Sequence, residues 1–118
     1  MLCWVEDDDD TQKLIARILE SVPYDVTIAK DGIEALTRLE QKDFDLILSD
    51  INMPNLDGFK LTEMINQKGI VAPIIFLTGS TSEQDEIRGF ELGAVDFIRK
   101  PIRKELLLSR ARNVLNKR

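Results

Sequence analysis

The chain has 118 residues, of which 43% are hydrophobic and 31% charged, and its formal net charge at pH 7 is −5. This length supports one hydrophobic core but not two, so a single domain over residues 1–118 is predicted. The acidic balance argues against a direct nucleic-acid surface, because phosphate backbones need a basic face. The single cysteine, Cys3, excludes an internal disulfide and a cysteine-based zinc site, and the chain has no histidine as a nitrogen ligand.

The chain has no sequence signal for insertion into a membrane. No apolar run approaches the roughly 20 residues needed to cross a bilayer, and the first residues lack the basic and apolar regions of a signal peptide. A lone cysteine favours a reduced, intracellular compartment. We therefore expect a cytoplasmic protein.

Short apolar or β-rich runs alternate with longer segments in which apolar residues recur every three or four positions. The short runs predict five strands, at residues 2–5, 26–29, 46–49, 74–78 and 97–99. Strict alternation of this kind is the βαβ signature of a parallel sheet covered on both faces. The predicted fold class is therefore α/β, a doubly wound five-stranded parallel sheet with five helices.

Two helices are predicted in the first half of the chain, each with one apolar face. The first follows the run of aspartates and extends to about Ser21, before Pro23, and the second is entered through residues 31–32. The residues predicted to line the buried faces of these helices are Leu14, Ile15, Ile18, Leu19, Val22, Ile33, Leu36 and Leu39.

Three more helices are predicted in the second half. The third carries apolar residues between positions 59 and 65 and is closed by Gly69 as a C-terminal cap. A capping-box pattern beginning at Ser82 opens the fourth, which ends near Gly93. The fifth runs from about Lys104 to the end of the chain.

Polar side chains follow four of the predicted strands. Glu6 and Asp7 follow the first, Asp50 the third, Thr78 ends the fourth and Lys100 follows the last. Open α/β sheets bind ligands at the carboxyl ends of their strands, where the winding direction reverses. These residues, scattered in sequence, are therefore expected to meet at one edge of the sheet.

The acidic members of this group predict a metal site. Carboxylates held within a few ångströms repel one another and have raised pKa values unless a cation is supplied. Oxygen ligands without histidine or thiol favour a hard ion, so Mg²⁺ (or Mn²⁺) is expected. Asp7 and Asp50 would be direct ligands, and Glu6 would contribute mainly through water.

Two acidic features have a simpler interpretation. Asp8, Asp9 and Asp10 are expected to be solvated and to stabilise the dipole of the first helix. The pair at residues 57–58, Asp-Gly, is interpreted as a turn.

The same group of residues predicts phosphoryl chemistry. With a metal and Lys100 neutralising the phosphoryl oxygens, Asp50 can attack an activated phosphoryl group in line and hold it as an acyl phosphate. The Thr78 hydroxyl can donate a hydrogen bond to one phosphoryl oxygen, and Lys100 can pair with another. These groups also stabilise the transition state for loss of the phosphoryl group to water, so the modification is expected to be transient.

Four sequence motifs that contain these residues resemble the receiver domain of two-component response regulators. The motifs lie at residues 5–8, 50–58, 77–80 and 93–101, so the resemblance covers essentially the whole chain. It implies a flavodoxin-like sheet with strand order 2-1-3-4-5.

The resemblance also implies a role for each residue at the metal. By this likeness Asp50 is the phosphoacceptor, Glu6 and Asp7 are the acidic pair, and the backbone carbonyl of Asn52 is the third protein ligand of the metal. Taken alone, Asp50 before a turn has an ordinary structural explanation. The joint placement of all these positions at strand ends favours the receiver interpretation.

A switch is implied by the same resemblance. Thr78 and Lys100 correspond to the switch threonine and the lysine of the family, and Phe97 falls where an aromatic ring changes rotamer as the threonine moves. Alone, Thr78 could be an ordinary strand-end residue and Phe97 an ordinary core aromatic. Phe97 lacks the hydroxyl of a tyrosine, so packing must carry the switch at this position.

The output surface is expected to be the face of the fourth helix, fifth strand and fifth helix, which should change on phosphorylation. Four charged residues there resemble part of a set through which one receiver subfamily dimerises: Glu91, Asp96, Arg110 and Arg112. Ordinary surface charge explains them equally well.

The favoured function is a signalling module that receives its phosphoryl group from a partner histidine kinase or histidine phosphotransfer protein. It would then control an output protein or domain, and the chain would be a stand-alone regulator or part of a longer protein. It would catalyse only its own phosphorylation and dephosphorylation, so it is not classed as an enzyme. One alternative is a receiver-like interaction module that works without phosphorylation.

A second alternative is an enzyme, either an aspartate-nucleophile phosphatase or a flavin-binding flavodoxin relative. Such phosphatases usually carry a second catalytic aspartate where Asn52 stands. A run of aspartates after the first strand would repel a flavin phosphate. Both enzyme hypotheses are therefore disfavoured.

Overall fold

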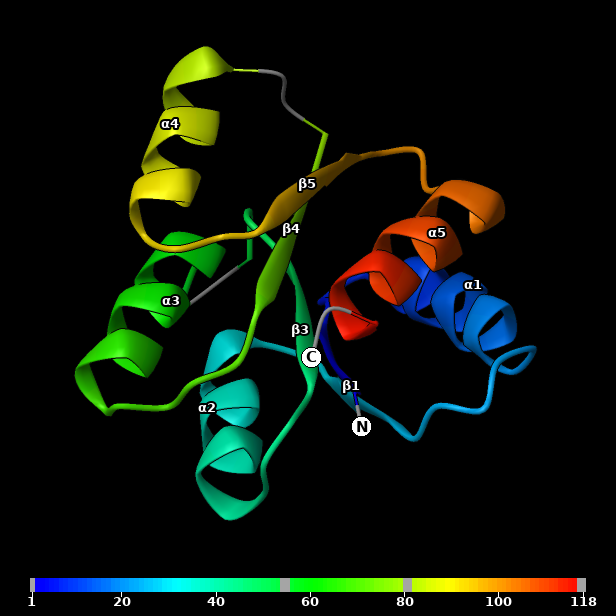
Figure 1. Cartoon of the computed structure of the whole chain (residues 1–118), viewed down its shortest axis with the longest axis horizontal. Helices are drawn as coiled ribbons and strands as arrows, with labels where there is room; N and C mark the ends of the chain where they lie inside the picture. The colour runs from blue at the N-terminus through cyan, green and yellow to red at the C-terminus, as the bar shows by residue number, and fades with distance from the viewer. Residues whose placement is uncertain (1, 54–55, 80–81, 117–118) are drawn as a thin grey trace.

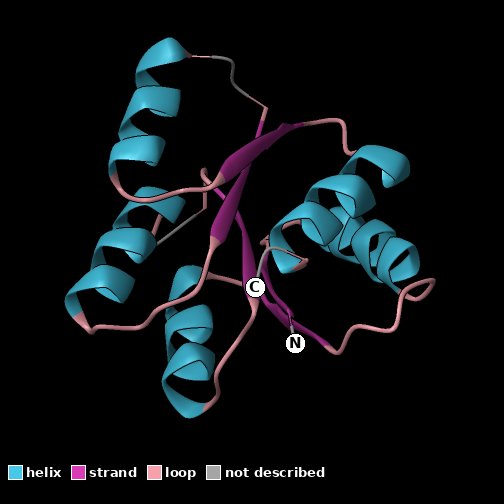
Figure 2. Cartoon of the chain, in the orientation of Figure 1, coloured by secondary structure: helices cyan, strands magenta, loops and turns pink. Residues whose placement is uncertain are grey.

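The computed structural model describes residues 2–53, 56–79 and 82–116, in which five strands and five helices alternate (Figures 1 and 2). Residues 54–55 and 80 of the motifs, and the two terminal residues of the predicted fifth helix, lie outside the described residues. The strands are β1 Leu2–Val5, β2 Val26–Ala29, β3 Leu46–Asp50, β4 Ile74–Thr78 and β5 Asp96–Arg99. The helices are α1 Asp9–Leu19, α2 Gly32–Gln41, α3 Gly58–Gln67, α4 Glu83–Glu91 and α5 Lys104–Leu115.

All strand pairs are parallel, and the sheet order is β2-β1-β3-β4-β5. The predicted fold class and strand order are confirmed. The winding direction reverses between β1 and β3, which are hydrogen-bonded neighbours with Val5 opposite Ser49. A crevice for a ligand is therefore expected beyond the carboxyl ends of these two strands.

The sheet lies between two helical layers. Helices α2, α3 and α4 cover one face, and α1 and α5 cover the other (Figure 1). Side chains of β1 alternate between them: Leu2 and Trp4 pack with α1 and α5, while Cys3 and Val5 pack on the opposite face. Every residue of β1, β3 and β4 is buried because both faces are covered.

Side-chain caps set where most helices begin. Four helices start after a side chain that accepts a hydrogen bond from the backbone N–H three residues on, and these capping residues are Asp8, Asp31, Asp57 and Ser82. Gly69 and Gly93 follow α3 and α4 with φ angles of 73° and 105°, a region that favours glycine. The predicted caps at Ser82 and Gly69 are confirmed.

Two predicted core positions are wrong. Leu14 and Ile33 are 46% and 58% exposed. In α1 the buried face is formed by Ile15, Ile18 and Leu19, and Leu14 lies at its edge. Ile33 precedes buried Ala35 by two positions, about 200° around the helix, and so lies on another face. Helix α1 also ends at Leu19, before the predicted Ser21.

Across the described ranges, no helix combines the length and the apolar character that a membrane crossing requires.

Substitutions at one buried and one exposed apolar residue should separate core packing from surface effects. Ile75 in β4 has no exposed area, so Ile75→Ala is expected to lower the free energy of unfolding by about 2–5 kcal/mol. Leu14→Ala is expected to change it by about 0.5 kcal/mol or less. Urea unfolding of both variants is the measurement, and equal losses would contradict the packing described above.

Candidate functional site

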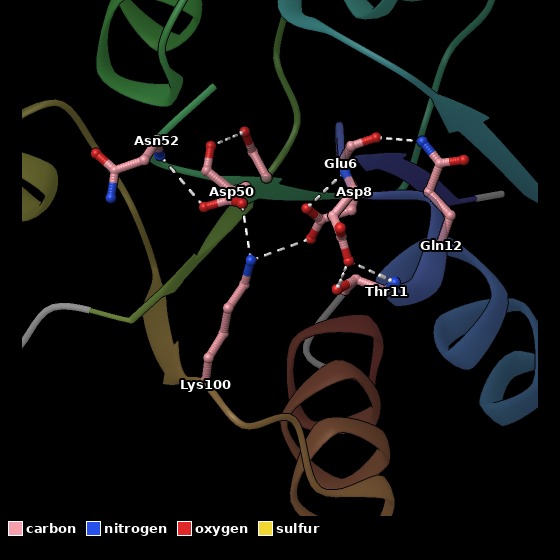
Figure 3. Close-up of polar contacts among 8 residues, drawn as sticks. Glu6, Asp8, Thr11, Gln12, Asp50, Asn52 and Lys100 are labelled. Carbon is pink, nitrogen blue, oxygen red and sulfur yellow. Dashed lines mark hydrogen bonds and ion pairs between the residues drawn. The ribbon is translucent and has the colours of Figure 1, made fainter. Parts of the chain in front are cut away.

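Three residues from distant parts of the chain meet at the carboxyl edge of the sheet (Figure 3). Lys100 Nζ lies 2.8 Å from Asp50 Oδ2 and 3.3 Å from Glu6 Oε1. Glu6 has no exposed area and Asp50 is 5% exposed, so both carboxylates are withdrawn from solvent. The structure therefore brings together an acidic pair and one lysine at the crevice beside β1 and β3.

The register of the strands positions these side chains. Val5 pairs with Ser49, so Glu6 and Asp50 leave adjacent strands at the same level. Lys100 directly follows β5, the strand next to β4 at the edge of the sheet. Its backbone N–H donates to the carbonyl of Thr78, the last residue of β4, at 2.8 Å. The main chain thus fixes where each functional group enters the crevice.

Asp7 completes a group that can hold a metal ion. Carboxylate oxygens of Glu6, Asp7 and Asp50 lie within 4.8 Å of one another, and of these residues Asp7 alone is exposed. Mg²⁺ binds oxygen at 2.0–2.1 Å, which places opposite ligands about 4.2 Å apart. The carboxylate cluster is therefore at most slightly wider than such an ion requires, and these residues fit a hard divalent cation.

Burial and charge act strongly on Glu6. Its burial, together with the charge of Asp50, raises the pKa of Glu6 to about 7, although Lys100 partly opposes this rise. Burial alone would lower the pKa of Lys100, but its hydrogen bond and charge interaction with Asp50, and its contact with Glu6, raise that pKa above the ordinary value. Lys100 thus stays charged and partly offsets the repulsion between the carboxylates.

The aspartates that follow Asp7, at residues 8–10, lie at the start of α1 and outside the carboxylate cluster. Asp8 Oδ2 accepts hydrogen bonds from the Thr11 backbone N–H at 2.9 Å and from Thr11 Oγ1 at 2.6 Å. These bonds from Thr11 lower the pKa of Asp8. Asp9 and Asp10 are exposed in the first turn of α1. The expected exposure of these three residues at the start of the first helix is confirmed, while the stabilisation of its dipole stays a prediction.

The remaining predicted site residues are Asn52, Thr78 and Phe97, and of these Asn52 contacts the carboxylate of Asp50. The Asn52 backbone N–H donates to Asp50 Oδ1 at 3.2 Å, while its carbonyl remains a predicted metal ligand. Thr78 is the last residue of β4 and is 4% exposed. Phe97 is half-buried on β5, opposite Phe76 of β4, and does not belong to the acidic group.

Gly58 is a structural contributor that the sequence interpretation missed. Its N–H donates to the Ile51 carbonyl at 2.8 Å, and a Cβ at this position would lie 2.5 Å from the Asp50 carbonyl oxygen. Only glycine lets the start of α3 pack this closely on the backbone that carries Asp50. Asp57 caps α3, so the interpretation of residues 57–58 as only a turn was wrong. Asp57-Gly58 directly before an apolar helical pattern was the available signal.

Residues 2–112 match the sequence model of the family described as the response regulator receiver domain. The chain belongs to this family. Among solved structures, the receiver domain is similar to the chemotaxis protein CheY4 of Vibrio cholerae, with 32% identity and a TM-score of 0.91. That comparison covers 97% of each chain.

Relatives of this chain include a respiration control protein and a sensor histidine kinase. The chain is 40% identical over 113 residues to the aerobic respiration control protein ArcA of Escherichia coli K12, covering 96% of this chain and 47% of the relative. It is 35% identical over 107 residues to the sensor histidine kinase RcsC of Salmonella typhimurium, covering 91% of this chain and 11% of that protein. The chain therefore spans about half, or much less, of the length of these relatives.

Because the pKa of Glu6 is raised, the stability of the folded protein should fall as pH rises when a metal chelator is present. Between 4.5, its ordinary pKa, and about 7, only the folded protein retains the Glu6 proton, so this residue lowers stability as pH rises through that interval. Glu6→Gln should therefore raise the melting temperature at about pH 8 but leave it nearly unchanged at about pH 4.

Asp9→Asn, which neutralises an exposed carboxylate of the same run, is the control for this comparison and should show no such pH-dependent gain. An equal change for Glu6→Gln at both pH values would show that burial does not shift the pKa of Glu6.

Proposed function

We propose that this receiver domain accepts a phosphoryl group on Asp50 in a Mg²⁺-dependent reaction. The donor would be a phosphohistidine on a partner kinase or phosphotransfer protein. The observation that carries the proposal is the 2.8 Å ion pair between Lys100 and Asp50 inside the group of three carboxylates. This arrangement supplies a buried nucleophile, the Asp50 carboxylate, and a cation, the Lys100 ammonium, that can pair with an oxygen of the incoming phosphoryl group.

The residues present fit the metal that this reaction needs. Asp7 and Asp50 would be direct ligands, with the Asn52 carbonyl as a third and Glu6 acting through water. Bound Mg²⁺ (or Mn²⁺) would neutralise the carboxylates and the phosphoryl oxygens. The remaining steps depend on the side chains of the chain itself.

In the transfer step, an Asp50 carboxylate oxygen attacks phosphorus in line. A P–O bond forms to Asp50 as the P–N bond to the donor histidine breaks, and the donor imidazole keeps the bonding electron pair and takes up a proton. Lys100 moves from the Asp50 oxygen to a phosphoryl oxygen, and the Thr78 hydroxyl donates to another. Attack by water at the same phosphorus reverses the modification, so the domain acts on itself and has no separate substrate to turn over.

The surface around α1 and Lys100 supports docking of the phosphodonor. A pocket of about 180 Å³ is lined by Thr11, Leu14, Lys100, Pro101 and Ile102. Leu14 is 46% exposed there, beside the lysine that contacts Asp50. An apolar partner surface could therefore dock next to the reacting carboxylate, in the cytoplasm where such kinases act.

The face formed by α4, β5 and α5 is the proposed output surface. Apolar side chains that are 39–52% exposed lie on it: Ile87, Phe90, Val95 and Leu106. A groove of about 390 Å³ runs between α4 and α5 over β5. An output protein or domain would bind here in a manner that depends on phosphorylation.

A phosphorylation-linked homodimer through the same face has one constraint. Arg110 Nη1 lies 2.8 Å from Asp96 Oδ2 within the chain. These are two of the residues that resemble a dimerisation set, so a dimer must form around this pair or exchange it between chains. Surface pairs of this kind contribute little energy, about 0–1 kcal/mol, and exchange is therefore feasible.

Intact mass measurement tests the proposed reaction. With Mg²⁺ and a small acyl phosphate or phosphoramidate donor, the protein is expected to gain one phosphoryl group, and Asp50→Asn to gain none. Asp57→Asn is the matched control, because an asparagine side chain can still cap α3, and it should be labelled like the wild type. An unmodified wild-type mass with every donor, or label retained in Asp50→Asn, would contradict the mechanism and favour an interaction module that needs no phosphorylation.

A further inference from the structure

Gly89 leaves a notch in the buried face of α4. A Cβ at this position would overlap Cζ of Phe97, and would lie 3.1 Å from Cε2 of that ring and 3.2 Å from Cδ2 of Phe76. Glycine inside a helix is less stable than alanine, so its presence here needs a compensating reason. The reason in this structure is space, because the Phe97 ring occupies the volume that any side chain at position 89 would fill.

Two other aromatic rings hold Phe97 in the notch. Its ring centroid lies 5.6 Å from that of Phe76 on β4 and 5.1 Å from that of Phe90 on α4. Both separations fall within the range of favourable aromatic pairs. The ring is therefore packed between β4 and α4, although the residue is only half-buried.

A surface groove lies beside the space that the Phe97 ring occupies at Gly89. The groove between α4 and α5, of about 390 Å³, is lined by Phe97 itself together with Phe90, Leu106 and Arg110. Rotation about the Cα–Cβ bond moves an aromatic ring between staggered rotamers. A ring that left the notch would therefore lie in this groove.

Helix α4 is tied to α3, so a clash at position 89 falls on the ring more than on the helix. Arg88 lies 3.6 Å from Glu63 and stacks with its guanidinium carbon 4.7 Å from the Phe59 ring centroid. Asn66 Nδ2 also donates to the Leu92 carbonyl at 2.9 Å. These contacts resist movement of α4 away from β5.

We infer that Gly89 is a positioning residue, whose missing side chain leaves the space in which the Phe97 ring lies inward and so biases the position of that ring at the α4-β5-α5 face. Phe76 and Thr78 are two residues apart on β4 and project to the same face of the sheet. The inward ring packs on Phe76, so it lies on the Thr78 side of the sheet. The regulatory consequence rests on the proposed function, whereas the position of the ring does not.

Gly89→Ala is expected to move the Phe97 ring into the groove. In protein with labelled phenylalanine rings, NMR relaxation of the Phe97 ring protons by a soluble paramagnetic chelate should increase several-fold over wild type. Gln84→Ala, on the exposed side of α4, should leave this relaxation unchanged. Unchanged relaxation in Gly89→Ala would overturn the inference.

A second background separates the clash from a general effect on the helix. Gly89→Ala should lower the melting temperature of the wild type, but should raise it or leave it unchanged in a Phe97→Leu background, where the ring is absent and alanine favours the helix. Equal lowering in both backgrounds would contradict the role of Phe97. If Gly89→Ala alone does not fold, folding of the double variant supports the inference, and its failure to fold overturns it.

The same proteins can be treated with Mg²⁺ and a small acyl phosphate while intact mass is recorded. Phosphoryl uptake in both wild type and Gly89→Ala, with the ring displaced only in the variant, supports a residue that sets the switch without taking part in the chemistry. Absence of uptake in both would contradict the proposed function, and the ring comparison would still decide the role of Gly89.

Discussion

The confinement of three carboxylates beside one lysine is the constraint on which this molecule depends. Glu6 and Asp50 are buried, and this burial, together with the charge of Asp50, raises the pKa of Glu6, while Lys100 opposes the rise only in part. A hard divalent cation would remove this strain, and an incoming phosphoryl group would give Lys100 a new partner. The same charge imbalance would therefore underlie the proposed metal binding, the proposed activation of the nucleophile and the proposed response to phosphorylation.

The main chain fixes the positions of the carboxylates that create this charge imbalance. Neighbouring β1 and β3 deliver Glu6 and Asp50 to the point where the winding reverses, and close packing of Gly58 fixes the turn after Asp50. Asp8 caps α1, whereas the adjacent Asp7 belongs to the carboxylate cluster, so neighbouring residues of the aspartate run have different partners. The buried strands thus position the residues of the proposed chemistry, and the half-buried Phe97 ring lies between Gly89 and the groove at the proposed output surface.

Local sequence patterns were sufficient for the alternation of strands and helices and for the caps at Ser82 and Gly69, because strand runs and capping residues act on their own neighbours. The sheet order was implied by the resemblance to the receiver family and not by these patterns. The expectation that strand ends converge also held for Glu6, Asp50 and Lys100, since parallel strands share one carboxyl edge. The exposure of Leu14 could not be judged in the same way, because it depends on which part of an apolar stripe the sheet covers. The tight approaches at Gly58 and Gly89 depend on how a helix packs on the neighbouring strand or turn, so the patterns that predict each element do not show these contacts.

Calorimetric titration with Mg²⁺ tests the central claim most directly. Asp7→Asn and Asp8→Asn make the same change of charge at adjacent positions, but only Asp7 belongs to the carboxylate cluster, and asparagine can still cap α1 at position 8. Asp7→Asn is expected to weaken Mg²⁺ binding by at least about tenfold, and Asp8→Asn to leave it within about twofold. Equal weakening by the two substitutions, or no weakening by Asp7→Asn, would contradict a metal site at the carboxylate cluster.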